Sequence, residues 1–307
     1  MDTAALLDRL TPAIVGRRRE VELVVAALGA ARHVVLEGPP GTGKSSMLRA
    51  VAHELGIGFE LVEGNAELTP ARLVGNFDPA LVLAEGYSPD NFVDGPLLAA
   101  LRSGGLLYIE ELNRVPEETL NVLVTVMSER EVTVPRLGRI VAEPGFRFVA
   151  AMNPFDSVGT ARISAAISDR VCRIAVGYQT ADDEGAIVRR HVAGVDDGWL
   201  DRAVELVRRT RHHPDVRVGS SVRGAIDLCA LAPELARLRG GTIHDPGVGL
   251  DAACAAVSGR IRVRDGSGRD ADEIVAELWH AVFDPPTEPD GDAGKARAPQ
   301  GASPLRT

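Results

Sequence analysis

Hydrophobic and polar positions follow two different patterns along the chain. From about residue 14 to residue 175, short β-branched apolar runs such as HVVLE, FELVE, GLLYIE and FRFVAAMN alternate with segments of helical spacing such as KSSMLRAVAHEL. Strands that alternate with helices predict an α/β fold with a parallel sheet. From Thr180 onward the spacing is helical only, through WLDRAVELVRRTR, SVRGAIDLCALA, LDAACAAVSG and ADEIVAELWHAVF. The pattern therefore predicts an α/β domain followed by a smaller all-helical domain.

The ends of these two domains have recognisable signals. Thr180 is a predicted N-cap, with Asp183 three residues further on, so the α/β domain is predicted to span residues 1–178 and the helical domain residues 179–283. The tail, residues 284–307, is rich in proline, glycine and charge and has no aromatic residue. Such a segment buries too little apolar surface to offset its ordering entropy, so we expect it to be disordered.

Composition narrows the class of protein. The 307 residues are 45% hydrophobic with a net charge of −9, which predicts a globular protein that does not bind nucleic acid or an anionic membrane over a broad surface. Cys172, Cys229 and Cys254 are far apart and lie in apolar stretches, which predicts buried free thiols in a reducing compartment. No membrane span or signal peptide is recognisable, so a cytoplasmic protein is expected.

A glycine-rich turn between a predicted strand and a predicted helix fits the phosphate-binding pattern GxxxxGK[ST]. Its glycines let backbone N–H groups approach phosphate oxygens, and the following helix directs its positive dipole end at the anion. Lys44 is expected to reach the β and γ phosphates of ATP, and the Ser45 hydroxyl to bind Mg²⁺. The residues predicted to hold the nucleotide here are Gly38, Pro39, Pro40, Gly41, Thr42, Gly43, Lys44, Ser45 and Ser46.

Two adjacent acids follow the buried run LLYI. Consecutive residues at a strand end point to different sides, so one of Glu110 and Glu111 can face a metal ion while the other faces the attacking water.

Six segments together resemble the MoxR-type AAA+ ATPases over about residues 14 to 230. In order and spacing they are IVGRRREVELVVAAL, LEGPPGTGKS, GPLLAALRSGGLLYIEELNRVPEETLNVLVTVMSEREVTVP, FRFVAAMNP, GTARISAAISDRV and VGSSVRGAIDL. The resemblance implies a P-loop AAA+ domain with a parallel sheet and a helical lid, an ATPase that requires ATP and Mg²⁺, and assembly into a ring, expected to be a hexamer. It also implies chaperone-like remodelling or maturation of a client protein, together with a partner that carries a von Willebrand factor A domain.

The same resemblance implies roles for single residues. Val15 and Gly16 match the adenine-side contact, Asn153 the polar sensor that helps place the attacking water, and Arg223 the second sensor on the lid. Arg170 matches the arginine finger donated to a neighbouring subunit, and the nearby Arg162 is the alternative.

Two further segments match the family. EVTVPRLGRIVAE predicts a β-hairpin from its alternation. The segment from Glu67 to Leu97 resembles an insertion that faces the ring centre, where Phe77 and Tyr87 either contact a partner or pack locally.

The chain departs from the family at one position. Glu110 stands where most members have aspartate, and Mg²⁺ tolerates geometric error poorly. We assign Glu110 to the water shell of Mg²⁺ and Glu111 to the attacking water, so Glu110→Asp is expected to keep or raise turnover. The alternative function is a slow or non-hydrolysing ATP-dependent switch or scaffold.

Overall fold

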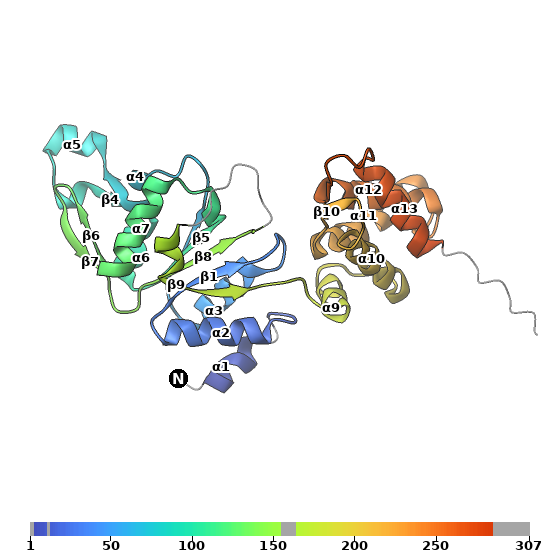
Figure 1. Cartoon of the computed structure of the whole chain (residues 1–307), viewed down its shortest axis with the longest axis horizontal. Helices are drawn as coiled ribbons and strands as arrows, with labels where there is room; N and C mark the ends of the chain where they lie inside the picture. Colours follow the sequence, from blue (N-terminus) through green and yellow to red (C-terminus); the bar gives the residue numbers. More distant parts are fainter. Residues whose placement is uncertain (1–2, 11–12, 155–163, 285–307) are drawn as a thin grey trace, which may run out of the picture.

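The computed structural model describes residues 3–10, 13–154 and 164–284, which form two lobes (Figure 1). An α/β lobe ends with strand β9 (Val171–Ala175), and a lobe made mainly of helices begins with helix α9 (Ala181–His191). The predicted α/β fold with a parallel sheet and a helical second domain is confirmed. The predicted disordered tail lies outside the described residues except for Asp284.

The α/β lobe is built on a five-stranded parallel sheet in the order β2-β5-β8-β1-β9. Its other strands are β1 (His33–Glu37), β2 (Phe59–Glu63), β5 (Leu106–Glu110) and β8 (Arg147–Met152). Because all five strands run the same way, their carboxyl ends meet at one edge of the sheet. Loops that follow different strands are thereby brought together at that edge.

Apolar side chains alternate between the two faces of this sheet. Leu106 and Tyr108 of β5 pack into one core, and Leu107 and Ile109 pack into another on the opposite face. The helices on the Tyr108 side are α1 (Thr3–Leu10), α2 (Arg18–Gly29) and α3 (Lys44–Leu55). The helices on the other side are α4 (Pro70–Val74), α6 (Pro96–Ser103) and α7 (Glu117–Glu129). The lobe also contains the short 3₁₀-helix η2 (Leu112–Arg114) and the four-residue helix α8 (Ala165–Ser168).

Two antiparallel ribbons extend from the α/β lobe. One pairs β3 (Gly75–Phe77) with β4 (Phe92–Asp94) around α5 (Pro79–Glu85) and η1 (Pro89–Asn91). The other is the hairpin predicted from sequence, β6 (Glu131–Val134) with β7 (Gly138–Val141), which is confirmed. Figure 1 shows α5 at the end of the lobe far from the helical lobe.

The aromatic residues of the insertion pack against each other. The Phe77 ring lies edge-on to Tyr87 and to Phe92, with centroids 5.0 and 4.9 Å apart. The Arg136 guanidinium from the hairpin lies 3.7 Å from the centroid of the Tyr87 ring. These contacts tie the insertion to the hairpin, which favours the local-packing alternative for both aromatic residues.

The second lobe is helical apart from a small sheet. Its helices after α9 are α10 (Asp197–Thr210), α11 (Val222–Arg239), α12 (Pro246–Val257), η3 (Ser258–Arg260) and α13 (Ala271–Phe283). The predicted N-cap is confirmed, because the Thr180 hydroxyl accepts a hydrogen bond from the Asp183 amide. The two-stranded antiparallel sheet of β10 (Val216–Val218) and β11 (Arg262–Val263) was not predicted, since runs of two or three residues give no reliable alternation signal.

The prediction that all three cysteines are buried is wrong for Cys172. Cys229 is buried and Cys254 half-buried, but Cys172 is exposed because it lies on β9, the edge strand of the sheet.

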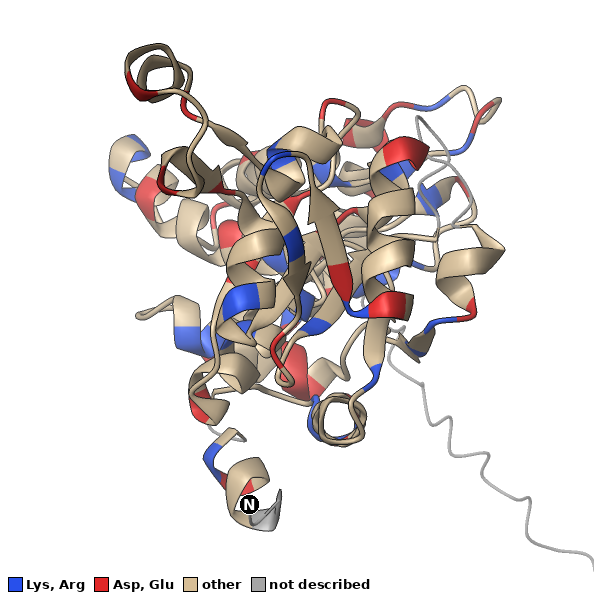
Figure 2. Cartoon of the chain, turned by 90° about the vertical axis from the view of Figure 1, so that its left-hand side faces the viewer, with Lys and Arg blue, Asp and Glu red and all other residues tan. Residues whose placement is uncertain are grey.

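Basic and acidic positions are interspersed over the face of the α/β lobe seen in Figure 2. Of the helices in the described part of the chain, none has the length and apolar character needed to cross a membrane.

A buried histidine at the start of β1 makes the sheet sensitive to pH. His33 is only 8% exposed, and its Nδ1 accepts a hydrogen bond from the Phe148 amide at 2.9 Å. Burial, with a smaller effect from the positive Arg147, lowers the pKa of His33 to about 4. The unfolded chain therefore binds a proton before the folded chain does, and stability present above pH 6.5 is lost as the pH falls toward 4.

Between pH 6.5 and pH 5, we expect protonation of His33 in the unfolded chain to lower the free energy of unfolding by about 2 kcal/mol. In the His33→Asn variant, an amide oxygen takes the place of Nδ1 as the hydrogen-bond acceptor. The amide does not titrate, so the stability of the variant should fall less over this pH range. Urea unfolding followed by circular dichroism at the two pH values measures the difference. Equal pH dependence in the wild type and the variant would contradict the assignment.

Candidate functional site

One pocket gathers most of the residues that the sequence singled out. It lies at the carboxyl edge of the sheet, where it faces the helical lobe. The side chains and backbone that line it come from four elements: Pro40, Gly41, Thr42, Gly43, Lys44, Ser45, Ser46, Glu110, Glu111, Ala151, Met152, Asn153 and Arg223. The phosphate loop, both acids, the predicted sensor after β8 and the predicted lid arginine therefore converge.

Two glycines of the phosphate loop lie where a side chain would clash with its neighbours. Gly38 passes so close to the residue that follows β9 that a Cβ there would lie 1.9 Å from the Val176 carbonyl oxygen. Gly41 has φ of 70°, and a Cβ there would lie 2.2 Å from the Ser221 hydroxyl of the helical lobe. The loop is thus in close contact with both lobes.

The Lys44 ammonium group folds back over this loop. It donates hydrogen bonds to the carbonyl oxygens of Gly38 at 3.0 Å and Pro39 at 2.7 Å, and to the Thr42 hydroxyl at 3.3 Å. Burial lowers the pKa of Lys44 to about 8, although the nearby Glu110 carboxylate opposes that effect. The charge is therefore largely desolvated and held at the N-terminus of α3, where an anion would be stabilised.

The two acids differ in environment. Glu110 ends β5, and one of its carboxylate oxygens accepts a hydrogen bond from the Tyr108 hydroxyl at 3.1 Å. The same hydroxyl lies 3.3 Å from the Ser45 hydroxyl. Burial, more than any other factor, raises the pKa of Tyr108. One hydroxyl thus links the two residues predicted to bind Mg²⁺.

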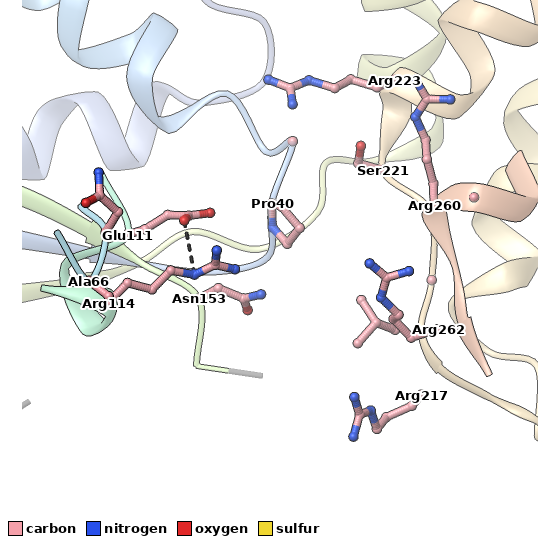
Figure 3. Close-up of a pocket in the computed structure, with 15 residues that line it drawn as sticks. Pro40, Ala66, Glu111, Arg114, Asn153, Arg217, Ser221, Arg223, Arg260 and Arg262 are labelled. Carbon is pink, nitrogen blue, oxygen red and sulfur yellow. Dashed lines mark ion pairs between the residues drawn. The ribbon is translucent and has the colours of Figure 1, made fainter. Parts of the chain in front are cut away.

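Glu111 has a left-handed backbone with φ of 49°, which is uncommon for a residue other than glycine. The residue lies between β5 and η2, and its side chain is 45% exposed. The Glu111 carboxylate forms an ion pair with Arg114 at 3.1 Å (Figure 3). Left-handed backbone at such a residue is typical of functional sites.

The two residues predicted to be sensors approach from opposite lobes. Asn153 directly follows β8, and its carbonyl oxygen accepts a bond from the Asn113 side chain at 3.5 Å. Arg223 lies in the first turn of α11 and, within the described residues, its guanidinium has no hydrogen bond or ion pair. Its unpartnered charge faces the phosphate loop.

Val15 and Gly16 are not among the residues that line this pocket. They lie where the lobes join: the Gln179 side-chain amide donates to the Val15 carbonyl at 2.5 Å, and a Cβ on Gly16 would lie 2.4 Å from the Asp183 carboxylate. The neighbouring Arg17 is buried and donates to the carbonyl oxygens of Thr42 and Gly177. Arg17 was not singled out from sequence, although it connects this segment to the phosphate loop.

Arg170 lies away from the pocket of its own chain. Its guanidinium donates to the Ser128 hydroxyl at 2.6 Å and to the Ala166 carbonyl at 2.8 Å, and with Arg32 and Arg130 it lines a separate hollow. Arg162, the alternative, lies outside the described residues.

A larger cavity of about 810 Å³ continues the site between the lobes, and the sequence had assigned its basic lining no role in the site. Figure 3 shows Arg217, Arg260 and Arg262 on the helical lobe facing Glu111, Arg114 and Asn153 across this space. Arg217 and Arg262 lie on β10 and β11, the strands that the pattern did not predict. Only recognition of that small sheet would have pointed to them.

The donor atoms at the site suit Mg²⁺. Ser45 and Glu110 offer hard oxygen ligands, which Mg²⁺ prefers. Among the described residues, no cluster of three or more His, Cys, Asp or Glu side chains could hold a metal alone. A Mg²⁺ ion here would therefore need oxygens from the nucleotide phosphates and water.

Comparisons with known proteins agree with this geometry. A family model described as an AAA domain of the dynein-related subfamily matches residues 33–171. The uncharacterized protein YeaC of Bacillus subtilis is 30% identical over 260 residues, which cover 76% of this chain and 78% of YeaC. An uncharacterized Staphylococcus epidermidis protein is 29% identical over 207 residues, covering 66% of this chain and 78% of that protein.

Two solved structures share the fold. A candidate ATPase from Cytophaga hutchinsonii is 19% identical with a TM-score of 0.52, over 91% of this chain and 94% of that one. A mutant of RuvB from Thermotoga maritima is 18% identical with a TM-score of 0.54, over 80% of this chain and 71% of that one.

Gly64, directly after β2, provides a test of the geometry around the acids. Its amide donates to the Glu110 carbonyl at 2.9 Å, and a Cβ would lie 2.6 Å from the carbonyl oxygens of both Glu110 and Glu111. Gly64→Ala must therefore displace the end of β5. We expect it to lower the unfolding free energy by about 1–3 kcal/mol and ATP turnover by about 100-fold.

The matched control is Gly29→Ala, where a Cβ meets nothing within 4 Å. Urea unfolding and a phosphate-release assay compare the two variants. If Gly64→Ala were as stable and as active as Gly29→Ala, the close approach of β2 to the acids would not matter.

Proposed function

The chain belongs to the AAA+ ATPases, and on this premise we propose that it is a MoxR-type member that binds and hydrolyses ATP between its two lobes. The observation that carries the proposal is the convergence of the phosphate loop, Glu110, Glu111, Asn153 and Arg223 on one pocket. A phosphate cradle with two acids, a polar side chain and an arginine on the second lobe is the set of parts that ATP hydrolysis uses.

The triphosphate of ATP would lie along the loop from Gly38 to Ser46. Lys44 would exchange its hydrogen bonds to the loop carbonyls for bonds to the β and γ phosphates. Because burial has already removed much of the water around the ammonium group, little hydration is lost in this exchange. We keep Val15 and Gly16 as the adenine-side contact, since Arg17 connects their segment to the loop.

Hydrolysis would use the groups around the γ phosphate. The oxygen of a water molecule bonds to the γ phosphorus as the bond to the bridging oxygen of ADP breaks, and Glu111 accepts the proton of that water. Asn153 would orient the water, and Arg223 would stabilise the charge that develops on the phosphoryl oxygens. Glu111 must leave its ion pair with Arg114 to act as this base.

Ser45 and Glu110 would hold Mg²⁺, Ser45 through its hydroxyl oxygen and Glu110 through the water molecules of the ion. When bound, the ion neutralises charge on the β and γ phosphates. The hard oxygen donors of both residues support this assignment.

We further propose that the protein acts as a cytoplasmic ring, with a hexamer as the expected form, in which Arg170 reaches the ATP of the neighbouring subunit. Arg170 lies on a different surface from the pocket of its own chain, as a residue that acts in trans must. Arg162 stays the alternative finger. The ring would remodel or mature a client protein, with a partner that carries a von Willebrand factor A domain.

The ion pair between Glu111 and Arg114 favours a second candidate function. A carboxylate engaged by a guanidinium is less available as a base, so ATP binding rather than turnover would do the work. The protein would then be a nucleotide-dependent switch or scaffold. Wild-type turnover well below ~0.001 per second, under the roughly 0.0003 per second of an unassisted GTPase switch, would support it.

Glu111→Gln tests the catalytic proposal. The amide cannot accept the proton, so we expect turnover to fall by about 100-fold or more while the dissociation constant for ATP stays within about threefold. Phosphate release and isothermal titration calorimetry measure the two quantities. Glu118→Gln, an exposed substitution in the first turn of α7, is the control. Unchanged turnover in Glu111→Gln would remove Glu111 from the mechanism.

Mixing two inactive variants tests the ring. Glu111→Gln subunits still donate Arg170, and Arg170→Ala subunits still carry Glu111, so an interface that combines both intact groups forms only in a mixed ring. Random assembly at equal amounts makes about a quarter of the interfaces competent, and we expect about that fraction of wild-type turnover. No recovery would argue against Arg170, and the same experiment with Arg162→Ala tests the alternative.

A further inference from the structure

Tyr108 is a buried tyrosine that lies beside Glu110 and the start of α3. The side chain is fully buried, and its ring packs against Phe59 with centroids 5.7 Å apart. It lies on the face of β5 that packs toward α3, and Glu110, two residues further on, points to the same face. Alternation along the strand therefore brings the Tyr108 hydroxyl, the Glu110 carboxylate and the start of α3 together.

The direction of the hydrogen bonds follows from the number of protons. A Tyr hydroxyl has one proton, and here it is donated to the Glu110 carboxylate at 3.1 Å. The 3.3 Å contact between Ser45 and Tyr108 must then be a bond that Ser45 donates. Ser45 thus directs its proton at Tyr108, which leaves the lone pairs of its oxygen available for a cation.

The length of Glu110 matches this arrangement. An aspartate carboxylate would be shorter by one carbon–carbon bond, about 1.5 Å, and a contact now at 3.1 Å would then exceed hydrogen-bond range. A tyrosine two residues earlier on the same face supplies a hydroxyl at the distance that glutamate reaches. The departure from the usual aspartate is therefore paired with a specific neighbour.

We propose that Tyr108 is a positioning residue for the cation that accompanies ATP: it orients the Ser45 hydroxyl and fixes the Glu110 carboxylate through one hydroxyl group. The inference rests on the proposed Mg²⁺-dependent ATP site. It adds that the geometry of both cation-binding residues depends on Tyr108, through the chain of hydrogen bonds from Ser45 to Tyr108 to Glu110.

The test is a double-mutant cycle of Tyr108→Phe and Glu110→Asp. Binding of a fluorescent ATP analogue is titrated with Mg²⁺ and repeated in EDTA, so the readout does not depend on hydrolysis. Loss of a group that orients a metal ligand commonly lowers metal affinity by 10–100-fold. We expect Tyr108→Phe to raise the Mg²⁺ concentration for half-saturation at least about tenfold and to leave binding in EDTA unchanged.

Coupling between the two positions separates positioning from a structural effect. When Glu110→Asp is already present, the shorter carboxylate no longer reaches the hydroxyl and only the bond from Ser45 remains to be lost, so Tyr108→Phe should shift the Mg²⁺ requirement by clearly less than it does in the wild-type background. Tyr178→Phe, which removes one hydrogen bond of a half-buried tyrosine to the Gly219 carbonyl, should leave the Mg²⁺ requirement unchanged. Thermal melting of each variant checks that it is folded.

The inference is overturned if Tyr108→Phe leaves the Mg²⁺ requirement unchanged, or shifts it equally with and without Glu110→Asp. It is also overturned if binding in EDTA weakens as much as binding with Mg²⁺. Failure of the proposed function has a different signature, because the wild type itself would then show no Mg²⁺-dependent binding of ATP.

Discussion

The parallel register of the central sheet is the constraint on which the site depends. Because β1, β5 and β8 are hydrogen-bonded neighbours that run the same way, the phosphate loop, the two acids and Asn153 all leave the sheet at one edge. Gly38 and Gly64 let the neighbouring chain segments pass within contact distance of these strand ends. Side chains at either position would separate the strand ends and with them the groups of the pocket.

The site also depends on the second lobe, because the α/β lobe supplies only part of the lining. Arg223 approaches the phosphate loop from α11, and Ser221 lies against Gly41. Any change in the relative position of the lobes therefore changes the distance between a cationic side chain and the phosphates. A bound triphosphate would attract groups from both lobes.

Charge at the pocket differs from charge over the whole chain. The net charge of −9 predicts weak attraction for anions, yet the space between the lobes is lined by several arginines. Charges a few ångströms away dominate the local potential, because salt screens distant ones. Burial also reduces the screening of these charges by water, although it disfavours the charged form of Lys44 and lowers its pKa. The net charge of the whole chain therefore does not predict the charge that lines this cavity.

Much of the fold and the site could be predicted from the sequence, because glycine spacing, strand alternation and helix caps are local signals. The phosphate loop, the hairpin before β8 and the Thr180 cap followed from residues within a few positions of each other. The hydroxyl of Tyr108, the basic lining from β10 and β11, and the exposure of Cys172 depended on tertiary structure. Each is set by which segments distant in sequence lie side by side. Sequence alone thus determined which groups are available to bind phosphate. The tertiary structure decided which of these groups meet, because contacts across a sheet or between lobes produce no periodic pattern in the sequence.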